Sequence, residues 1–219
     1  MRPALLFDLD GTLIDSIELI MRSMRHAFDG YGARAPSDDE WRALIGRPLI
    51  ESFREFVVEE PEVERLIGRY REYQLEHHDR LVRPYDGIVA AIRAFAAAGH
   101  PMALVTSKAD WLATRALVHV GLDDAIPVVV GCDTVARHKP HPEPVQRALV
   151  LLRATPEHAI FVGDSPHDID AGRAAGVYTI AVTWGAFTRD EMDRAGADAV
   201  IHEVGQLAAA VTRAARGDG

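Results

Sequence analysis

The sequence contains one cysteine and no long apolar stretch, and these two absences narrow the kinds of protein it can be. A single thiol, Cys132, excludes an internal disulfide and a cysteine-rich metal site, and it fits a reducing compartment. No run of apolar residues approaches the length needed to span a bilayer. We therefore expect a cytoplasmic protein with no membrane partner, in which Cys132 is buried as a small hydrophobic residue.

Positive charge is scarce as well. Lys and Arg number 24 against 33 Asp and Glu, which gives a formal net charge of -9 at pH 7. A chain with this balance offers no broad basic face to a nucleic-acid backbone, so we expect no nucleic-acid partner. Apolar residues make up 48% of the 219 residues, which is enough for a packed core. The composition therefore predicts a globular protein, and we expect a monomer or a homodimer.

Short apolar runs that end in a polar residue or a glycine recur along the chain and predict buried strands. They comprise residues 4–7, 102–105, 127–130, 159–162, 178–182 and 198–201. Segments with helical spacing lie between the later runs, at residues 87–98, 109–119, 143–153 and 168–175. This alternation predicts an α/β fold with a doubly wound, Rossmann-like parallel sheet. Polar residues follow the strands at their carboxyl ends, which is the edge where open parallel sheets bind ligands.

Residues 15–83 break this alternation, because they contain no convincing strand and show helical spacing instead. Ser37 and Glu40 form the pattern of a capping box, which marks the start of a helix. Apolar stripes along the block predict that it has a core of its own. The sequence therefore predicts an all-helical domain, residues 15–83, inserted into an α/β core domain formed by residues 1–14 and 84–219.

Two carboxylates, Asp8 and Asp10, stand at the end of the first predicted strand and are followed by Gly11. Carboxylates beside a buried strand need a counter-charge, and a hard cation such as Mg²⁺ prefers oxygen ligands. Asp164 follows another strand and is placed to supply a further ligand, with Asp168 in a supporting position at the start of the next helix. Taken alone, Asp-x-Asp-Gly is as typical of a local turn as of a catalytic site.

Hydroxyl and positively charged residues accompany these acids. Thr106 and Ser107 follow a predicted strand and open a helix, so their hydroxyl and main-chain N–H groups are placed to bind an anion. Lys108 is adjacent to them, and Lys139 adds a second compact positive charge. These are the only two lysines among the 24 basic residues. Their position beside the acids favours a functional site over a local turn.

In chain order these residues form the segments Asp8-Leu9-Asp10-Gly11-Thr12, Thr106-Ser107, Lys139-Pro140-His141-Pro142 and Gly163-Asp164-Ser165-Pro166-His167-Asp168. The set resembles the four motifs of the haloacid dehalogenase superfamily. The helical insert directly after the first segment resembles the cap domain of that family, so the resemblance covers nearly the whole chain. The Thr-Ser-Lys segment and the turn at Gly46 look most like the phosphoglycolate phosphatase and pyrophosphatase branch.

The resemblance implies a Mg²⁺-dependent phosphatase whose partner is a small phosphorylated metabolite, either a phosphoglycolate-like phosphomonoester or pyrophosphate. Asp8 would be the nucleophile that forms an aspartyl phosphate, and Asp10 would be the general acid and base. The metal ligands would be Asp8, the main-chain carbonyl of Asp10, and Asp164. Lys139 would offset the repulsion between Asp8 and a dianionic phosphate.

The resemblance also implies where the substrate is bound. Thr106, Ser107 and Lys108 would bind the non-bridging phosphate oxygens, since positioning and electrostatics supply most of the rate in phosphoryl transfer. The cap would decide which ester is accepted. In the cap, Arg47 lies in a turn between two predicted helices. It is placed either to reach an anionic group of the substrate or to remain a solvated surface residue.

Two other functions would use similar residues. A sugar-phosphate mutase of the same superfamily would use Asp8 and Asp10 but return the phosphate to its substrate. Members of that type usually carry a histidine in the first cap helix, at the position of Ile20 in this chain. A receiver-type signalling module also combines Asp, Mg²⁺, a hydroxyl residue and Lys on a parallel sheet, but it lacks an inserted cap. We therefore prefer hydrolysis.

Overall fold

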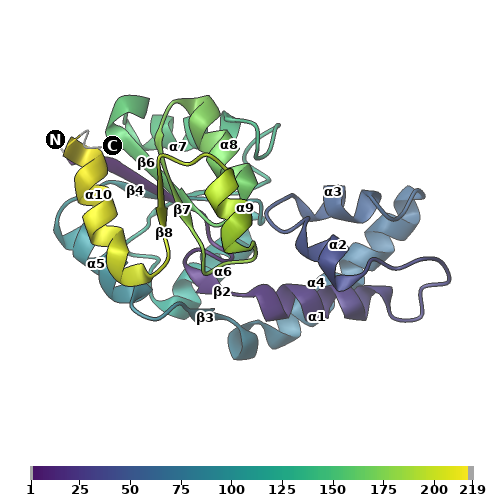
Figure 1. Ribbon diagram of the computed structural model, residues 1–219. Coiled ribbons are helices and arrows are strands. Elements are labelled where there is room, and N and C mark those ends of the chain that lie inside the picture. The colour runs from purple at the N-terminus through teal and green to yellow at the C-terminus, as the bar shows by residue number, and fades with distance from the viewer. Residues whose placement is uncertain (1, 217–219) are drawn as a thin grey trace.

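The computed structural model describes residues 2–216 and shows an open parallel sheet with helices on both faces (Figure 1). The strand order is β5-β4-β1-β6-β7-β8, and each neighbouring pair is parallel. The strands are β1 (Ala4–Phe7), β4 (Met102–Val105), β5 (Val128–Val130), β6 (Ala159–Gly163), β7 (Tyr178–Val182) and β8 (Ala199–Ile201). The predicted α/β fold is confirmed, including its sixth strand.

Side chains of the central strands alternate between two layers of helices. These helices are α5 (Ile88–Ala97), α6 (Asp110–Val120), α7 (Glu143–Leu152), α8 (Pro166–Ala175), α9 (Arg189–Arg194) and α10 (Leu207–Arg216). Leu5 and Phe7 of β1 pack in the layer of α5, α6 and α10. Leu6, between them, packs in the layer of α7 and α8. A strand buried on both faces needs a continuous apolar run, which explains why β1 has no polar position.

The position of β1 between β4 and β6 fixes where a ligand can bind. After β1 the chain passes to β4 and β5 on one side, and later to β6, β7 and β8 on the other. The connections after β1 and its neighbours therefore diverge and open a crevice at the carboxyl ends of these strands. Asp8, Thr106 and Asp164 directly follow β1, β4 and β6.

The four helices between β2 and β3 form the cap beside the sheet (Figure 1). They are α1 (Ile17–Phe28), α2 (Asp38–Arg42), α3 (Leu49–Arg54) and α4 (Glu60–Leu81). The cap has an aromatic core, in which Phe28 and Phe53 stack at a ring separation of 5.4 Å and Trp41 meets Phe53 at 5.0 Å. An antiparallel ribbon of β2 (Ile14–Asp15) and β3 (Arg83–Pro84) connects the cap to the sheet, and the predicted domain boundaries fall within these strands.

Two local expectations have different outcomes. The capping box at the start of α2 is confirmed, because Ser37 Oγ accepts a hydrogen bond from the main-chain N–H of Glu40 and the Glu40 carboxylate accepts one from Ser37 N–H. The prediction that Cys132 is buried is wrong, since it lies in the loop beyond β5 and is only half-buried. No helix within residues 2–216 combines the length and apolar character of a membrane span.

Candidate active site

Three carboxylates gather where β1 and β6 end. Asp8 follows β1, Asp164 follows β6, and Asp168 lies in the first turn of α8. Carboxylate oxygens of all three lie within 4.8 Å of one another, and the residues are 4%, 2% and 0% exposed. Phe7 pairs with Val162 in the neighbouring strand, so the residues that follow the two strands meet at the same edge. The strand register thus brings distant acids of the sequence together.

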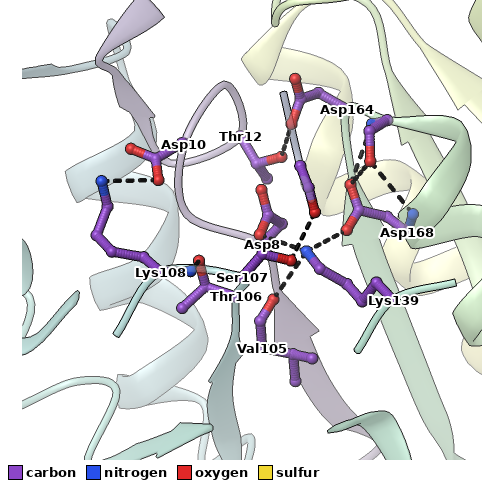
Figure 2. Close-up of polar contacts among 12 residues, drawn as sticks. Asp8, Asp10, Thr12, Val105, Thr106, Ser107, Lys108, Lys139, Asp164 and Asp168 are labelled. Carbon is purple, nitrogen blue, oxygen red and sulfur yellow. Dashed lines mark hydrogen bonds and ion pairs between the residues drawn. The ribbon is translucent and has the colours of Figure 1, made fainter. Parts of the chain in front are cut away.

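Lys139 neutralises part of this charge. Its ammonium donates hydrogen bonds to Asp8 Oδ1 at 2.7 Å and to Asp168 Oδ1 at 2.5 Å (Figure 2). Burial alone would lower the pKa of Lys139, but Asp168 and Asp8 together raise that pKa above its ordinary value. One buried cation among three buried acids leaves an excess of negative charge when all the acids are ionised.

The excess charge affects the protonation of the acids. Burial raises the pKa of Asp8 well above its ordinary value although Lys139 opposes the shift, and burial together with Asp168 raises the pKa of Asp164 to about 7. Asp8 and Asp164 therefore tend to bind a proton unless a further cation lies beside them. A divalent cation that prefers oxygen ligands would supply the missing charge, so the residues fit Mg²⁺. The donors available to it are the carboxylates of Asp8 and Asp164.

Asp164 is fixed by groups that approach it very closely. Thr12 Oγ1 donates a hydrogen bond to Asp164 Oδ1 at 3.0 Å, and the main-chain N–H of Ala186 donates to Oδ2 at 2.9 Å. A Cβ on Gly11 would lie 2.2 Å from Asp164 Oδ2, and one on Gly185 would lie 2.1 Å from it. Gly11 also has a φ of +87°, in the left-handed region that favours glycine. Nothing in the sequence indicated a role for Thr12 beyond its place beside Gly11.

Asp168 supports the site through Lys139. Its Oδ1 accepts the hydrogen bond from Lys139, while its Oδ2 accepts hydrogen bonds from the main-chain N–H and the hydroxyl of Ser165 at 3.0 and 2.6 Å. Ser165 is also the N-cap residue of α8, and the two residues form a capping box. Because both carboxylate oxygens have donors, Asp168 is placed to orient Lys139, in keeping with the supporting position expected for it.

Asp10 faces the other lysine, Lys108. Its Oδ1 accepts a hydrogen bond from the Ser16 hydroxyl at 2.5 Å, and the Lys108 ammonium lies 3.0 Å from its Oδ2. In Figure 2, Lys108 and Lys139 lie on opposite sides of Asp8. The sequence placed Lys108 near phosphate and did not single out Ser16. The structure shows that both side chains orient the Asp10 carboxylate.

The two hydroxyl residues after β4 differ in what they contact. Thr106 is 4% exposed, and its Oγ1 accepts a hydrogen bond from the main-chain N–H of Lys108 at 3.2 Å, which leaves the hydroxyl proton available to a ligand. The Ser107 hydroxyl donates to the main-chain carbonyl of Gly46 in the cap at 2.5 Å. Ser107 thus joins core to cap. Phosphate contacts by these residues and by Lys108 stay predictions.

A cavity of about 480 Å³ extends from Asp8 and Asp10 into the cap. Arg47 lines this cavity. Its guanidinium, however, pairs with Glu55 at 3.1 Å and lies 3.9 Å from Glu51. Arg47 is therefore near the place where a substrate would bind but is engaged by acids of the cap, and a substrate contact there stays a prediction.

The chain is similar to known proteins in both sequence and fold. The family model of haloacid dehalogenase-like hydrolases matches residues 5–182. The chain is 41% identical over 179 residues to the pyrophosphatase PpaX of Bacillus cereus strain G9842, a match that covers 82% of each chain. A crystal structure of a predicted phosphatase from Clostridium acetobutylicum superposes with a TM-score of 0.85 at 26% identity, over 97% of this chain and 99% of the other. A predicted phosphoglycolate phosphatase from Haemophilus somnus 129pt has a similar fold, with a TM-score of 0.87 at 23% identity over 95% and 97% of the two chains.

Proposed function

Because this chain belongs to the haloacid dehalogenase-like hydrolase family, we propose that it is a Mg²⁺-dependent phosphatase working through an aspartyl phosphate on Asp8. Its substrate would be a small phosphorylated metabolite, either a phosphomonoester or pyrophosphate. The phosphatase relatives support the reaction class. The observation that carries the mechanism is the buried contact of Asp8 with Lys139, beside Asp164.

In the first step the Asp8 carboxylate would attack phosphorus, and the bond from phosphorus to the leaving oxygen would break. Lys139 reduces the repulsion between this carboxylate and the incoming phosphate, and Asp168 keeps the ammonium in place. Mg²⁺, bound by Asp8, Asp164 and the main-chain carbonyl of Asp10, would neutralise charge on the phosphoryl oxygens. Thr106, whose Oγ1 accepts from the main-chain N–H of Lys108, would donate its hydroxyl proton to one of these oxygens.

Asp10 would move the protons in both steps. It would first donate a proton to the leaving oxygen, which departs as an alcohol from a phosphomonoester or as phosphate from pyrophosphate. It would then take a proton from the water that attacks phosphorus and releases Asp8. The contacts with Ser16 and Lys108 fix the direction of its carboxylate. A mutase reaction is less well supported, because the wall of the cavity carries apolar Ile20 where mutases usually have a histidine.

Phosphate release tests this proposal directly. We expect the purified protein to release phosphate from pyrophosphate or a small phosphomonoester in the presence of Mg²⁺, and to lose that activity when EDTA is added. Restoration by excess Mg²⁺ is the control for damage by the chelator. Conversion of one sugar phosphate into its isomer without phosphate release would replace the proposal with the mutase reaction. A long-lived phosphoprotein without turnover would indicate a receiver-type switch.

The pH dependence of stability provides a second test. In the metal-free protein the pKa of Asp164 is about 7 against an ordinary value of 3.8, so the folded state binds a proton more tightly than the unfolded state does. Stability should therefore fall as pH rises between about 4 and 7. Mg²⁺ needs the ionised carboxylate, so it should raise the melting temperature more at pH 8 than at pH 5.5, as measured by scanning fluorimetry. An equal Mg²⁺ effect at both pH values, or an undiminished effect at pH 8 in Asp164→Asn, would contradict this prediction.

A further inference from the structure

One stripe of the cap helix α4 faces the cavity that leads to Asp8 and Asp10. Starting from Glu64, its residues follow at three, four, seven and ten positions along the chain, which places them on one face of the helix. They are Glu64, Ile67, Gly68, Arg71 and Gln74, and all five line the cavity. The stripe is therefore the part of α4 that a substrate's leaving group would meet.

The cavity is larger and more apolar than a very small substrate requires. Its volume of about 480 Å³ lies within the range of roughly 300–1,000 Å³ that is typical of sites for drug-sized ligands. Pyrophosphate and phosphoglycolate are much smaller than such ligands and carry charge at both ends. The side chains of Ile20, Leu44, Ile67 and Leu112 form apolar parts of the wall. An apolar wall favours an apolar body in the leaving group, since burying that body removes its surface from water.

Gly68 keeps part of this wall open. A glycine inside a helix costs about 1 kcal/mol relative to alanine. Packing does not require it here, because a Cβ at this position would have no neighbour within 4 Å, and its φ is not in the left-handed region. The absence of a side chain at Gly68 leaves space in the cavity.

Gln74 supplies a polar group at the end of the stripe. The residue is only 4% exposed, and it lines the cavity. An amide on the wall of the cavity can form a hydrogen bond with a polar group of a bound ligand, which adds affinity at this point. The amide can both donate and accept, which suits a hydroxyl or amide group rather than a second phosphate.

We propose that the α4 stripe is the leaving-group site and that Gln74 and Gly68 determine specificity. The preferred substrate is then the phosphate monoester of an alcohol that has a ring-sized apolar body and a hydrogen-bonding group facing Gln74. This inference rests on the proposed phosphatase function and narrows it, because it places pyrophosphate and phosphoglycolate among the accepted but poorer substrates.

The test compares kcat/KM for four substrates: pyrophosphate, phosphoglycolate, benzyl phosphate and 4-(hydroxymethyl)benzyl phosphate. We expect benzyl phosphate to exceed phosphoglycolate by about tenfold, and the hydroxymethyl group to add a further gain of about tenfold. Gln74→Leu should abolish the second gain and leave benzyl phosphate unchanged. A purely structural role for Gln74 would lower both benzyl esters together, so the ratio of the two is the decisive measurement.

Gly68→Leu fills the cavity without straining the helix, so it should lower kcat/KM for both benzyl esters by about tenfold or more while sparing pyrophosphate. Gly68→Ala controls for helix propensity, and both variants should melt no lower than the parent protein. Gly32→Leu, in an exposed cap loop with open space around it, is the control for activity.

The outcomes separate this inference from the function on which it rests. Mg²⁺-dependent hydrolysis that favours pyrophosphate and is unaffected by Gly68→Leu would overturn the leaving-group site and leave the phosphatase intact. No phosphate release from any of the four substrates, in the parent protein and in Asp8→Asn alike, would overturn both.

Discussion

Asp8→Asn should reduce phosphate release on the order of 10⁴-fold or more, because the amide cannot form the aspartyl phosphate. The fold should survive the change. Asparagine is nearly the same size as aspartate, and losing one of three crowded carboxylates relieves repulsion in the metal-free protein. We therefore expect the melting temperature in EDTA to rise by about 2–4 °C, which corresponds to about 1 kcal/mol. Phosphate release and scanning fluorimetry measure the two effects.

Asp15→Asn is the matched control for this variant. Asp15 is a nearby but exposed acid in β2, so its loss removes a carboxylate without touching the buried cluster. Its activity should stay within about twofold of the parent, as is usual for changes at exposed positions. Residual turnover above a few per cent in Asp8→Asn would show that another group attacks phosphorus. A lower melting temperature in EDTA would show that Asp8 stabilises the metal-free fold.

The sequence predicted where the candidate catalytic groups lie, because strand ends determine their position. Buried parallel strands appear as short apolar runs, and the polar residue after each run must lie at the carboxyl edge of the sheet. Asp8, Thr106 and Asp164 follow β1, β4 and β6 for this reason. Adjacent strands then bring them together without any information about side-chain packing. The same argument explains why the expected sixth strand was found at β8.

The sequence could not predict the contacts that depend on how the cap packs against the core. The buried face of α4 includes two polar residues, Gln74 and His78. A polar residue on a buried face has no periodic signal, because its burial depends on what the neighbouring element leaves open. The contact of Ser107 with Gly46 is hidden for the same reason, since the two residues lie in different domains.

Lys139→Met should have the second large effect, and this one involves stability as well as activity. Lys139 is 2% exposed and contacts both Asp8 and Asp168, so its removal leaves three buried carboxylates with no positive side chain among them. Removing one partner of a buried ion pair typically costs about 3–5 kcal/mol. We expect a loss of this size in urea unfolding in EDTA, with part of it restored by Mg²⁺, and a fall in activity on the order of 10³-fold or more.

Lys108→Met is the matched comparison for Lys139→Met. Lys108→Met also removes one ammonium beside a carboxylate, but its partner Asp10 is more accessible, with a side chain that is 15% exposed against 6% for Asp8 and 1% for Asp168. Water can solvate Asp10 after the change, so the loss in stability should stay near about 1 kcal/mol. A similar loss in the two variants would mean that charge in the buried cluster does not control the stability of this site. A large loss confined to Lys139→Met and reduced by Mg²⁺ would mean that lysine and metal neutralise the same three acids.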